Sequence, residues 1–204
     1  MVTRRSKSLH VGVAGLPPAY GPTVLIREEG PQDHAAVARV HALAFGDQGA
    51  AVASLVDDLR LSLATEPGLS LVAVDADAVV GNVLFTRSLL DAPDRLVDVQ
   101  VLSPVGILPD HQGRGIGSAL IRHGLEQFAG GEVPLVFLEG SPAYYRRFGF
   151  RPGREHGFRR PSLRIPEAAF QVCLLPAYAT WMTGTLVYRR EFWDHDLVGL
   201  REPA

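Results

Sequence analysis

A glycine-rich segment between an apolar run and a helix-forming stretch has the composition of an anion-binding loop. Residues 112–120 read Gln-Gly-Arg-Gly-Ile-Gly-Ser-Ala-Leu and directly follow the apolar run 101–108. The first N–H groups of a helix have no intrahelical acceptor, so a helix start suits an anion such as pyrophosphate. Glycine also permits backbone conformations and close approaches that a side chain would block. The segment therefore predicts a loop that holds a phosphate group.

The spacing of the glycines separates this loop from two other phosphate-binding loops. A P-loop requires Lys and then Ser or Thr after its last glycine, whereas here Ser118 and Ala119 follow the last glycine. A dinucleotide-binding loop reads G-x-G-x-x-G, and the third glycine, Gly117, comes one position too early for it. A glycine-rich turn without a ligand is the remaining alternative.

A second motif lies downstream, at residues 142–150, which read Pro-Ala-Tyr-Tyr-Arg-Arg-Phe-Gly-Phe. It resembles the Tyr-Tyr-x-x-x-Gly-Phe helix and turn that follow the fifth strand in many members of the GNAT superfamily. The string Gln112-x-x-Gly115-x-Gly117 resembles the acetyl-coenzyme A loop of the same superfamily, Gln/Arg-x-x-Gly-x-Gly/Ala. The resemblance extends from about Val24 to the C-terminus and includes a group of small bacterial predicted acetyltransferases.

The resemblance implies an α+β GNAT fold, with a mixed, mostly antiparallel central sheet and helices on both faces. Members of the superfamily splay the fourth and fifth strands apart, which here would be residues 101–108 and 135–138. We expect residues 24–204 to form a single acetyl-CoA-binding domain. Residues 1–23 contain several Gly and Pro residues and are expected to form a flexible N-terminal arm.

The implied cosubstrate is acetyl-CoA, and no metal is expected. Its pantetheine arm would bond the backbone of the fourth strand, and the glycine loop would wrap its pyrophosphate. The residues assigned to acetyl-CoA are Gly106, Ile107, Leu108, Gln112, Gly113, Arg114, Gly115, Ile116, Gly117 and Ser118.

Tyr145 matches the tyrosine of the superfamily that protonates the departing coenzyme A thiolate. A phenol with a pKa of about 10 can donate to a thiolate whose thiol has a pKa of about 8.5 at a small thermodynamic cost. Some relatives place a glutamate, as general base, on the fourth strand, where this chain has Gln100. Glu139, at the end of the fifth strand, is therefore the candidate for the general base or for a residue that anchors the substrate. The alternative is that Glu139 is simply a solvated residue at the end of its strand.

The function implied by the resemblance is N-acetyltransfer from acetyl-CoA to a primary amine, by direct attack in a ternary complex. The alternative is a non-catalytic acyl-CoA-binding regulatory module. The acceptor is an unidentified small molecule or protein amino group, and a homodimer is compatible with the superfamily. Residues 146–164 contain seven arginines and one acid, Glu155. They would bind a cofactor phosphate, the acceptor or solvent.

The composition of the chain is compatible with the function that the resemblance implies. The chain has 204 residues and a net charge of −2, which provides no general attraction to nucleic acid or to acidic membranes. It has no apolar run near the roughly 18 residues of a membrane span, so we expect no membrane association. The single cysteine, Cys173, rules out an intrachain disulfide and suits a cytoplasmic location.

Hydrophobic periodicity predicts the elements that position these motifs. Residues 32–45, a segment containing Val52 to Leu59, and the stretch after the glycine loop read as helices. The predicted strands are residues 24–27, 69–74, 79–86, 95–108, 135–138, 169–175 and 184–188. Pro104 cannot donate a ladder hydrogen bond, so pairing of the fourth strand is expected to be interrupted there.

Overall fold

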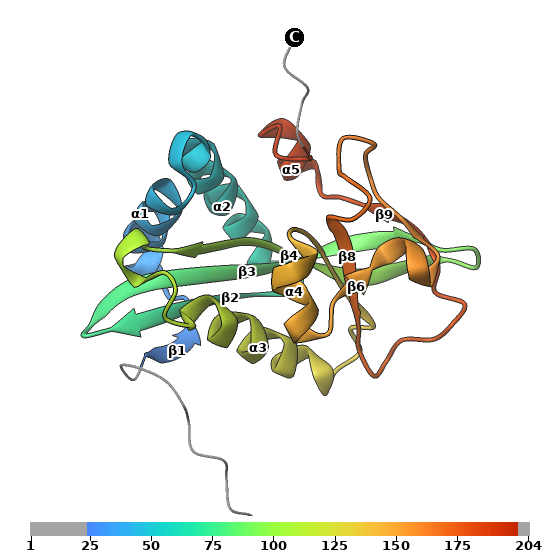
Figure 1. Cartoon of the computed structure of the whole chain (residues 1–204), viewed down its shortest axis with the longest axis horizontal. Helices are drawn as coiled ribbons and strands as arrows, with labels where there is room; N and C mark the ends of the chain where they lie inside the picture. Colours follow the sequence, from blue (N-terminus) through green and yellow to red (C-terminus); the bar gives the residue numbers. More distant parts are fainter. Residues whose placement is uncertain (1–23, 200–204) are drawn as a thin grey trace, which may run out of the picture.

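The computed structural model describes residues 24–199 (Figure 1). The arm predicted for residues 1–23 lies outside the described residues. The helices are α1 (His34–Ala44), α2 (Gly49–Leu63), α3 (Ile116–Ala129), α4 (Pro142–Tyr145) and α5 (Arg190–Asp194). The strands are β1 (Leu25–Glu28), β2 (Gly68–Asp75), β3 (Ala78–Asp91), β4 (Leu96–Ile107), β5 (Leu135–Glu139), β6 (Arg151–Pro152), β7 (Phe158–Arg159), β8 (Phe170–Leu174) and β9 (Gly184–Val187).

These strands form one sheet in the order β1-β2-β3-β4-β5-β8-β6, and β9 pairs with both β3 and β7. The β4–β5 and β7–β9 pairs are parallel, and the other pairs are antiparallel. Helices α1 and α2 cover one face of the sheet and α3 covers the other (Figure 1). The predicted α+β architecture, with a mixed, mostly antiparallel sheet between helices, is therefore confirmed.

Strands β4 and β5 separate soon after they meet. Gln100 pairs with Val136 and Val101 with Phe137, and β4 then continues to Ile107 without a β5 partner. Strand β5 instead pairs along its whole length with β8, from Leu135 to Glu139. The splay predicted between the fourth and fifth strands is present, and it leaves one edge of β4 open.

A bulge in β4 lies directly after this separation. Phe85 pairs with Leu102 and Val83 with Val105, so two residues of β4, Ser103 and the cis-linked Pro104, lie opposite one residue of β3. The interruption expected at Pro104 is confirmed. A one-residue shift moves side chains to the other face of a strand, so the bulge changes which side chains of β4 face each helix layer.

The burial pattern shows this change of face. Val99 and Val101 belong to the core cluster under α1 and α2, together with Leu55 and Leu59. After the bulge, Val105 and Ile107 pack on the opposite face, in the cluster that contains Leu120 of α3. Gly106, which lies between Val105 and Ile107, therefore faces α1.

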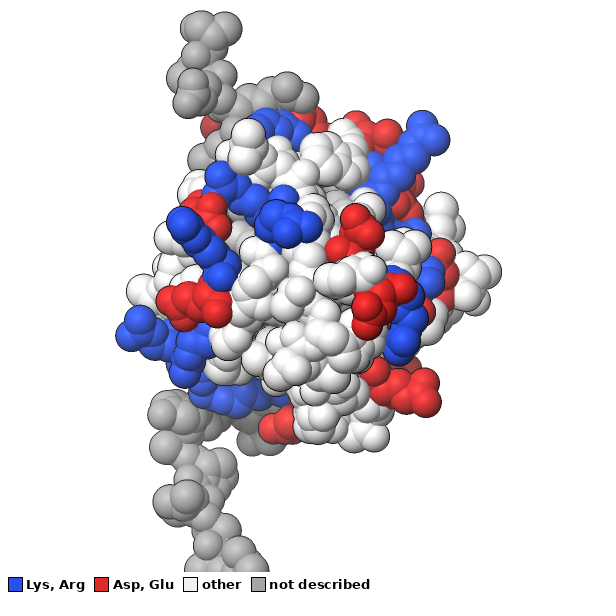
Figure 2. Space-filling model, turned by 90° about the vertical axis from the view of Figure 1, so that its right-hand side faces the viewer, with Lys and Arg blue, Asp and Glu red and all other residues white. Residues whose placement is uncertain are grey.

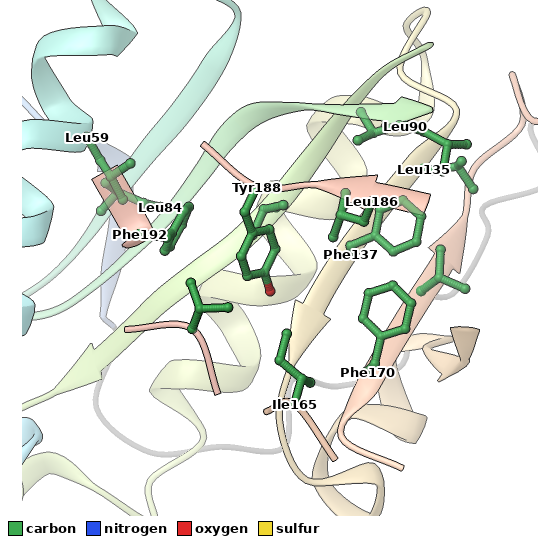
Figure 3. Close-up of a cluster of buried hydrophobic side chains, with 14 of the residues drawn as sticks. Leu59, Leu84, Leu90, Leu135, Phe137, Ile165, Phe170, Leu186, Tyr188 and Phe192 are labelled. Atoms are coloured by element: carbon green, nitrogen blue, oxygen red, sulfur yellow. The ribbon is translucent and has the colours of Figure 1, made fainter. Parts of the chain in front are cut away.

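Aromatic packing holds β5 against β8 and β7. The Phe137 ring stacks on Phe170 with centroids 5.5 Å apart, and it meets Phe158 edge-on at 5.1 Å. Figure 3 shows the Phe137 and Phe170 rings beside Leu135 of β5 and Leu186 of β9. These contacts fix β5 on the side away from β4, which keeps the splay open.

Candidate active site

The glycine loop has the backbone conformation expected for an anion site. Gly113 and Gly115 have φ values of 74° and 82°, in the left-handed region that disfavours other residues. A Cβ at either position would meet no atom within 4 Å, so conformation rather than crowding requires glycine there. Gly115 is the N-cap of α3 and provides no side-chain cap. The N–H groups of the first turn of α3 are thus available to a ligand.

The side chain of Gln112 fixes the geometry of this loop. Its side-chain amide donates a hydrogen bond of 3.1 Å to the carbonyl of Ile107, the last residue of β4. The backbone N–H of His111 bonds the carbonyl of Leu108 at 2.8 Å. Together these bonds hold the loop against the end of β4. The amide of Gln112 therefore acts on loop geometry in this structure.

Tyr144 approaches the start of α3. Its hydroxyl oxygen lies 3.2 Å from the position that a Cβ on Gly117 would occupy, so the glycine makes room for it. The Arg147 guanidinium lies 4.9 Å from the centroid of the Tyr144 ring. The structure places Tyr144, with Arg147, beside the predicted pyrophosphate loop.

The open edge of β4 presents backbone groups to the slot. The N–H of Leu108 bonds the carbonyl of Val80 on β3 at 2.9 Å. In an antiparallel pair these bonds alternate, so Gly106 also bonds toward β3, whereas Val105 and Ile107 direct their N–H groups to the free edge. Of the three strand residues assigned to the pantetheine arm, Ile107 presents its N–H to the slot. Val105, whose N–H points to the same edge, was not among the residues assigned from the sequence.

A fully buried histidine lies over Gly106. His41 of α1 places its Nδ1 2.7 Å from where a Cβ on Gly106 would be. Its Nε2 lies 2.8 Å from Oδ1 of Asn82, whose amide nitrogen donates to the carbonyl of Leu71 at 2.9 Å. That bond sets the amide orientation, so Nε2 carries the proton and Nδ1 is an acceptor, without a partner among residues 24–199. Burial lowers the pKa of His41 to about 4.

Tyr145 lies on the face of β5 that carries α3. Its ring meets Phe148 and Phe150 edge-on, and a Cβ on Gly140 would collide with it. Burial, with a smaller contribution from Tyr144, raises the pKa of Tyr145 to about 12. The ordinary pKa near 10 expected from the sequence is therefore wrong for this phenol, because its surroundings disfavour the charged form. Tyr145 is fully protonated at neutral pH.

Glu139 lies at the same strand end but on the opposite face. It alternates along β5 with Leu138, which packs toward α3, and shares the α1–α2 face with Phe137. Its Oε2 accepts a hydrogen bond of 3.2 Å from the N–H of Gly199. Burial raises the pKa of Glu139, and the bond from Gly199 and the charge of Arg164 oppose that rise.

Tyr188 was not anticipated from the sequence. It directly follows β9, is 7% exposed, and packs its ring on Phe192 of α5 with centroids 5.0 Å apart. Burial raises the pKa of Tyr188, and the charge of Glu139 raises it further. The only sequence signal is its place at the end of an apolar run, which also fits a core residue.

The arginine-rich segment 146–164 is partly neutralised. Arg160 pairs with Glu167, and Arg164 pairs with Asp196 at 2.7 Å. Arg159 donates to the hydroxyl of Thr185 at 2.9 Å. On the face formed by this half of the domain, basic and acidic side chains are interspersed (Figure 2). Arg147, one of the seven arginines of this segment, contacts the ring of Tyr144, which lies beside the glycine loop.

Within residues 24–199, none of the helices combines the length and the apolar character that crossing a bilayer requires. The same part of the chain contains no group of three or more His, Cys, Asp or Glu side chains placed to hold a metal ion.

Comparisons with known proteins agree on one family. A family model described as an acetyltransferase (GNAT) domain matches residues 26–153. The uncharacterized N-acetyltransferase YjhQ of Escherichia coli K12 is 34% identical over 147 residues, which cover 70% of this chain and 78% of YjhQ.

Two solved structures are similar in both sequence and fold. The GNAT family N-acetyltransferase YhbS of Escherichia coli, in complex with CoA, is 30% identical with a TM-score of 0.75, covering 84% of this chain and 93% of that one. A GNAT family acetyltransferase of Brucella melitensis, in complex with acetyl-CoA, is 32% identical with a TM-score of 0.65. The match covers 84% of this chain and 99% of that one.

Proposed function

The chain belongs to the GNAT acetyltransferase family, and from that premise we propose that it transfers the acetyl group of acetyl-CoA to a primary amine, by direct attack within a ternary complex. The complexes of YhbS with CoA and of the Brucella melitensis relative with acetyl-CoA support the choice of cosubstrate. The acceptor is a small molecule or a protein amino group.

The glycine loop and the free edge of β4 are suited to hold acetyl-CoA. The left-handed Gly113 and Gly115 expose the first N–H groups of α3, which favour the pyrophosphate. The N–H groups of Val105 and Ile107 point into the slot that β5 leaves open, where an extended pantetheine arm can add like a strand. One of these N–H groups is also placed to stabilise the oxyanion of acyl transfer.

The observation that carries the proposal is the placement of Glu139 and Tyr145 on opposite faces of one strand end. Glu139 faces the α1–α2 side, and Tyr145 contacts Gly140 from the α3 side. In direct attack the new C–N bond forms as the C–S bond breaks. In this proposal Glu139 takes the proton from the amine nitrogen, and Tyr145 gives its proton to the sulfur.

The high pKa of Tyr145 is compatible with this role. A phenol with a pKa of about 12 is a weaker acid than an ordinary tyrosine. The same low-polarity surroundings also disfavour a thiolate, so they favour the neutral thiol as the product. Keeping the phenol protonated ensures that the donor is available across the neutral range.

The test is a Tyr145→Phe variant, compared with Tyr144→Phe as a matched control on the same short helix. We expect Tyr145→Phe to bind acetyl-CoA with an unchanged Kd and to lose about 10²- to 10³-fold in amine-dependent thiol release, the usual contribution of a general acid. Tyr144→Phe should keep kcat and alter mainly the KM for acetyl-CoA. An unchanged kcat in Tyr145→Phe would reject the general-acid role.

A non-catalytic acyl-CoA-binding module is the second candidate. It is favoured by Gln100, which stands where some relatives have a glutamate and is buried, with its amide nitrogen bonded to the carbonyl of Pro67 at 3.2 Å. Selective acetyl-CoA binding without thiol release, across a panel of primary amines, would favour this candidate over the enzyme.

A further inference from the structure

The hydroxyl of Tyr188 is a polar group without an evident structural purpose. The side chain is 7% exposed, and its ring belongs to the core cluster with Phe192, Ile165 and Val198. Within residues 24–199 its oxygen makes no hydrogen bond. The oxygen is not one of the fully buried side-chain atoms without a partner, so solvent or a ligand can reach it. A phenylalanine would fill this core equally well, so the hydroxyl is better explained by a ligand than by packing.

The direction of the side chain identifies where that ligand lies. Figure 3 shows the Tyr188 hydroxyl directed away from Phe192 and toward the C-terminal end of β5. Glu139 is the last residue of β5, and its negative charge acts on Tyr188. The phenol and the carboxylate are thus neighbours, yet no hydrogen bond joins them.

Glu139 has one oxygen available on this side. Its Oε2 accepts the N–H of Gly199, which fixes the carboxylate, while Oε1 makes no hydrogen bond within the described part of the chain. The nearby cation, Arg164, is engaged with Asp196 at 2.7 Å and lies over the Trp193 ring. The carboxylate is therefore oriented without being neutralised by a direct ion pair.

We propose that Glu139 and Tyr188 together bind the nitrogen of the acceptor, each accepting one N–H of a primary amine. Two N–H groups held in this way leave the nitrogen lone pair free for the thioester carbon on the splayed side of β5. The site selects primary amines, because a secondary amine retains a single N–H and a tertiary amine has none. This inference rests on the proposed acetyl transfer and assigns its acceptor class and a further binding residue.

The first experiment compares Tyr188→Phe with the wild-type protein, using propylamine and N-methylpropylamine as probes and thiol release from acetyl-CoA as the readout. We expect the KM for propylamine to rise about tenfold, the value for one lost hydrogen bond. The KM for N-methylpropylamine should change little, so the preference for the primary amine shrinks. The Kd for acetyl-CoA and the Tm should be preserved, because no internal hydrogen bond is removed. Tyr178→Phe, whose ring packs on Phe158, is the control.

An unchanged propylamine KM in Tyr188→Phe, in an enzyme that turns over, would overturn this inference and leave the proposed function intact. If propylamine is not acetylated, a binding measurement tests the inference in place of the kinetic experiment. The protein is saturated with CoA, its five tyrosines are labelled with carbon-13, and propylamine is titrated while their signals are followed.

The signals are assigned with single Tyr→Phe variants. We expect the Tyr188 signal to shift on addition of propylamine, and the shift to be lost in Glu139→Gln. A Tyr188 signal that does not respond, in protein that binds CoA, would overturn the inference. Protein that binds neither CoA nor acetyl-CoA would contradict the proposed function itself.

Discussion

At the scale of single residues, the site depends on alternation along one strand end. Glu139 faces the α1–α2 side, and the adjacent Gly140 leaves room for the Tyr145 ring on the other side. Acyl transfer needs a proton acceptor for the nitrogen and a proton donor for the sulfur, on the two sides of the reacting carbon. In the proposed reaction, Glu139 at the end of β5 is the acceptor and Tyr145 of α4, packed against Gly140, is the donor.

The buried His41 makes a residue-scale prediction about acid stability. Its pKa is about 4 in the folded protein and about 6.5 when unfolded, so the unfolded state binds more protons between these values. Its contribution to stability is complete above pH 6.5 and is lost as the pH falls toward 4. Between pH 7 and pH 5 the free energy of unfolding should fall by about 2 kcal/mol from this group alone.

Urea denaturation at the two pH values measures this change. His41→Gln retains a group near Nε2 to bond Asn82 but does not titrate. We expect the fall in unfolding free energy from pH 7 to pH 5 to be about 2 kcal/mol smaller in the variant than in the wild type. Equal pH dependence in both proteins would contradict the assignment of His41 as a buried, neutral imidazole.

Sequence reasoning identified some of these residues and missed others for a physical reason. Gly115 and Tyr145 belong to short motifs whose spacing is visible in the chain. His41 and Tyr188 acquire their significance from partners on distant strands, Asn82 and Glu139. Neither lies in a local pattern, so a single sequence offers only their apolar surroundings, which also describe ordinary core positions.

At the scale of elements, the proposed anion site depends on the turn between β4 and α3. The turn must enter the left-handed region twice, at Gly113 and Gly115, so that the first N–H groups of α3 point outward. Gln112 fixes the turn to the end of β4. The loop conformation, rather than any charged side chain, thus prepares the site.

Substituting alanine at Gly115 tests this conformation. Gly115 has φ of 82° and open space around its Cβ position, whereas Gly130, at the other end of α3, has φ of −93° and equally open space. We expect Gly115→Ala to lower the unfolding free energy by about 1–2 kcal/mol, because alanine is strained in the left-handed region. It should also weaken acetyl-CoA binding.

The matched control is Gly130→Ala, which should be neutral or slightly stabilising and should leave the Kd unchanged. Thermal denaturation and titration calorimetry measure the two effects. If both alanine variants behaved alike, the loop conformation would not be the reason for glycine at position 115.

The main elements were predictable because they are long enough to show a period. The faces of α2 and α3 were visible in the spacing of Leu55, Leu59 and Ile121, which are all buried. The strands β6 and β7 have two residues each, too short for any periodicity. The strand β3 extends to Asp91, beyond the predicted end at residue 86, because its last residues pair with both β4 and β9. Such pairing is a long-range property that local pattern does not contain.

At the scale of the whole molecule, the sheet separates two working sides. The glycine loop, Tyr144 and Tyr145 lie on the α3 side of the sheet. Glu139 and Tyr188 lie on the α1–α2 side, where Figure 3 shows Tyr188. The splay between β4 and β5 forms an opening in the sheet between these two sides. In the proposed reaction, acetyl-CoA approaches from the α3 side and the amine from the α1–α2 side, and they meet at the end of β5.

The proposed function requires this slot to hold acetyl-CoA. Titration calorimetry of the full chain, with NAD and ATP as controls in the same buffer, measures that binding. We expect saturable binding of acetyl-CoA at one site and no comparable binding of NAD or ATP. Absence of acetyl-CoA binding in a folded sample, or equal binding of all three nucleotides, would contradict the proposed function.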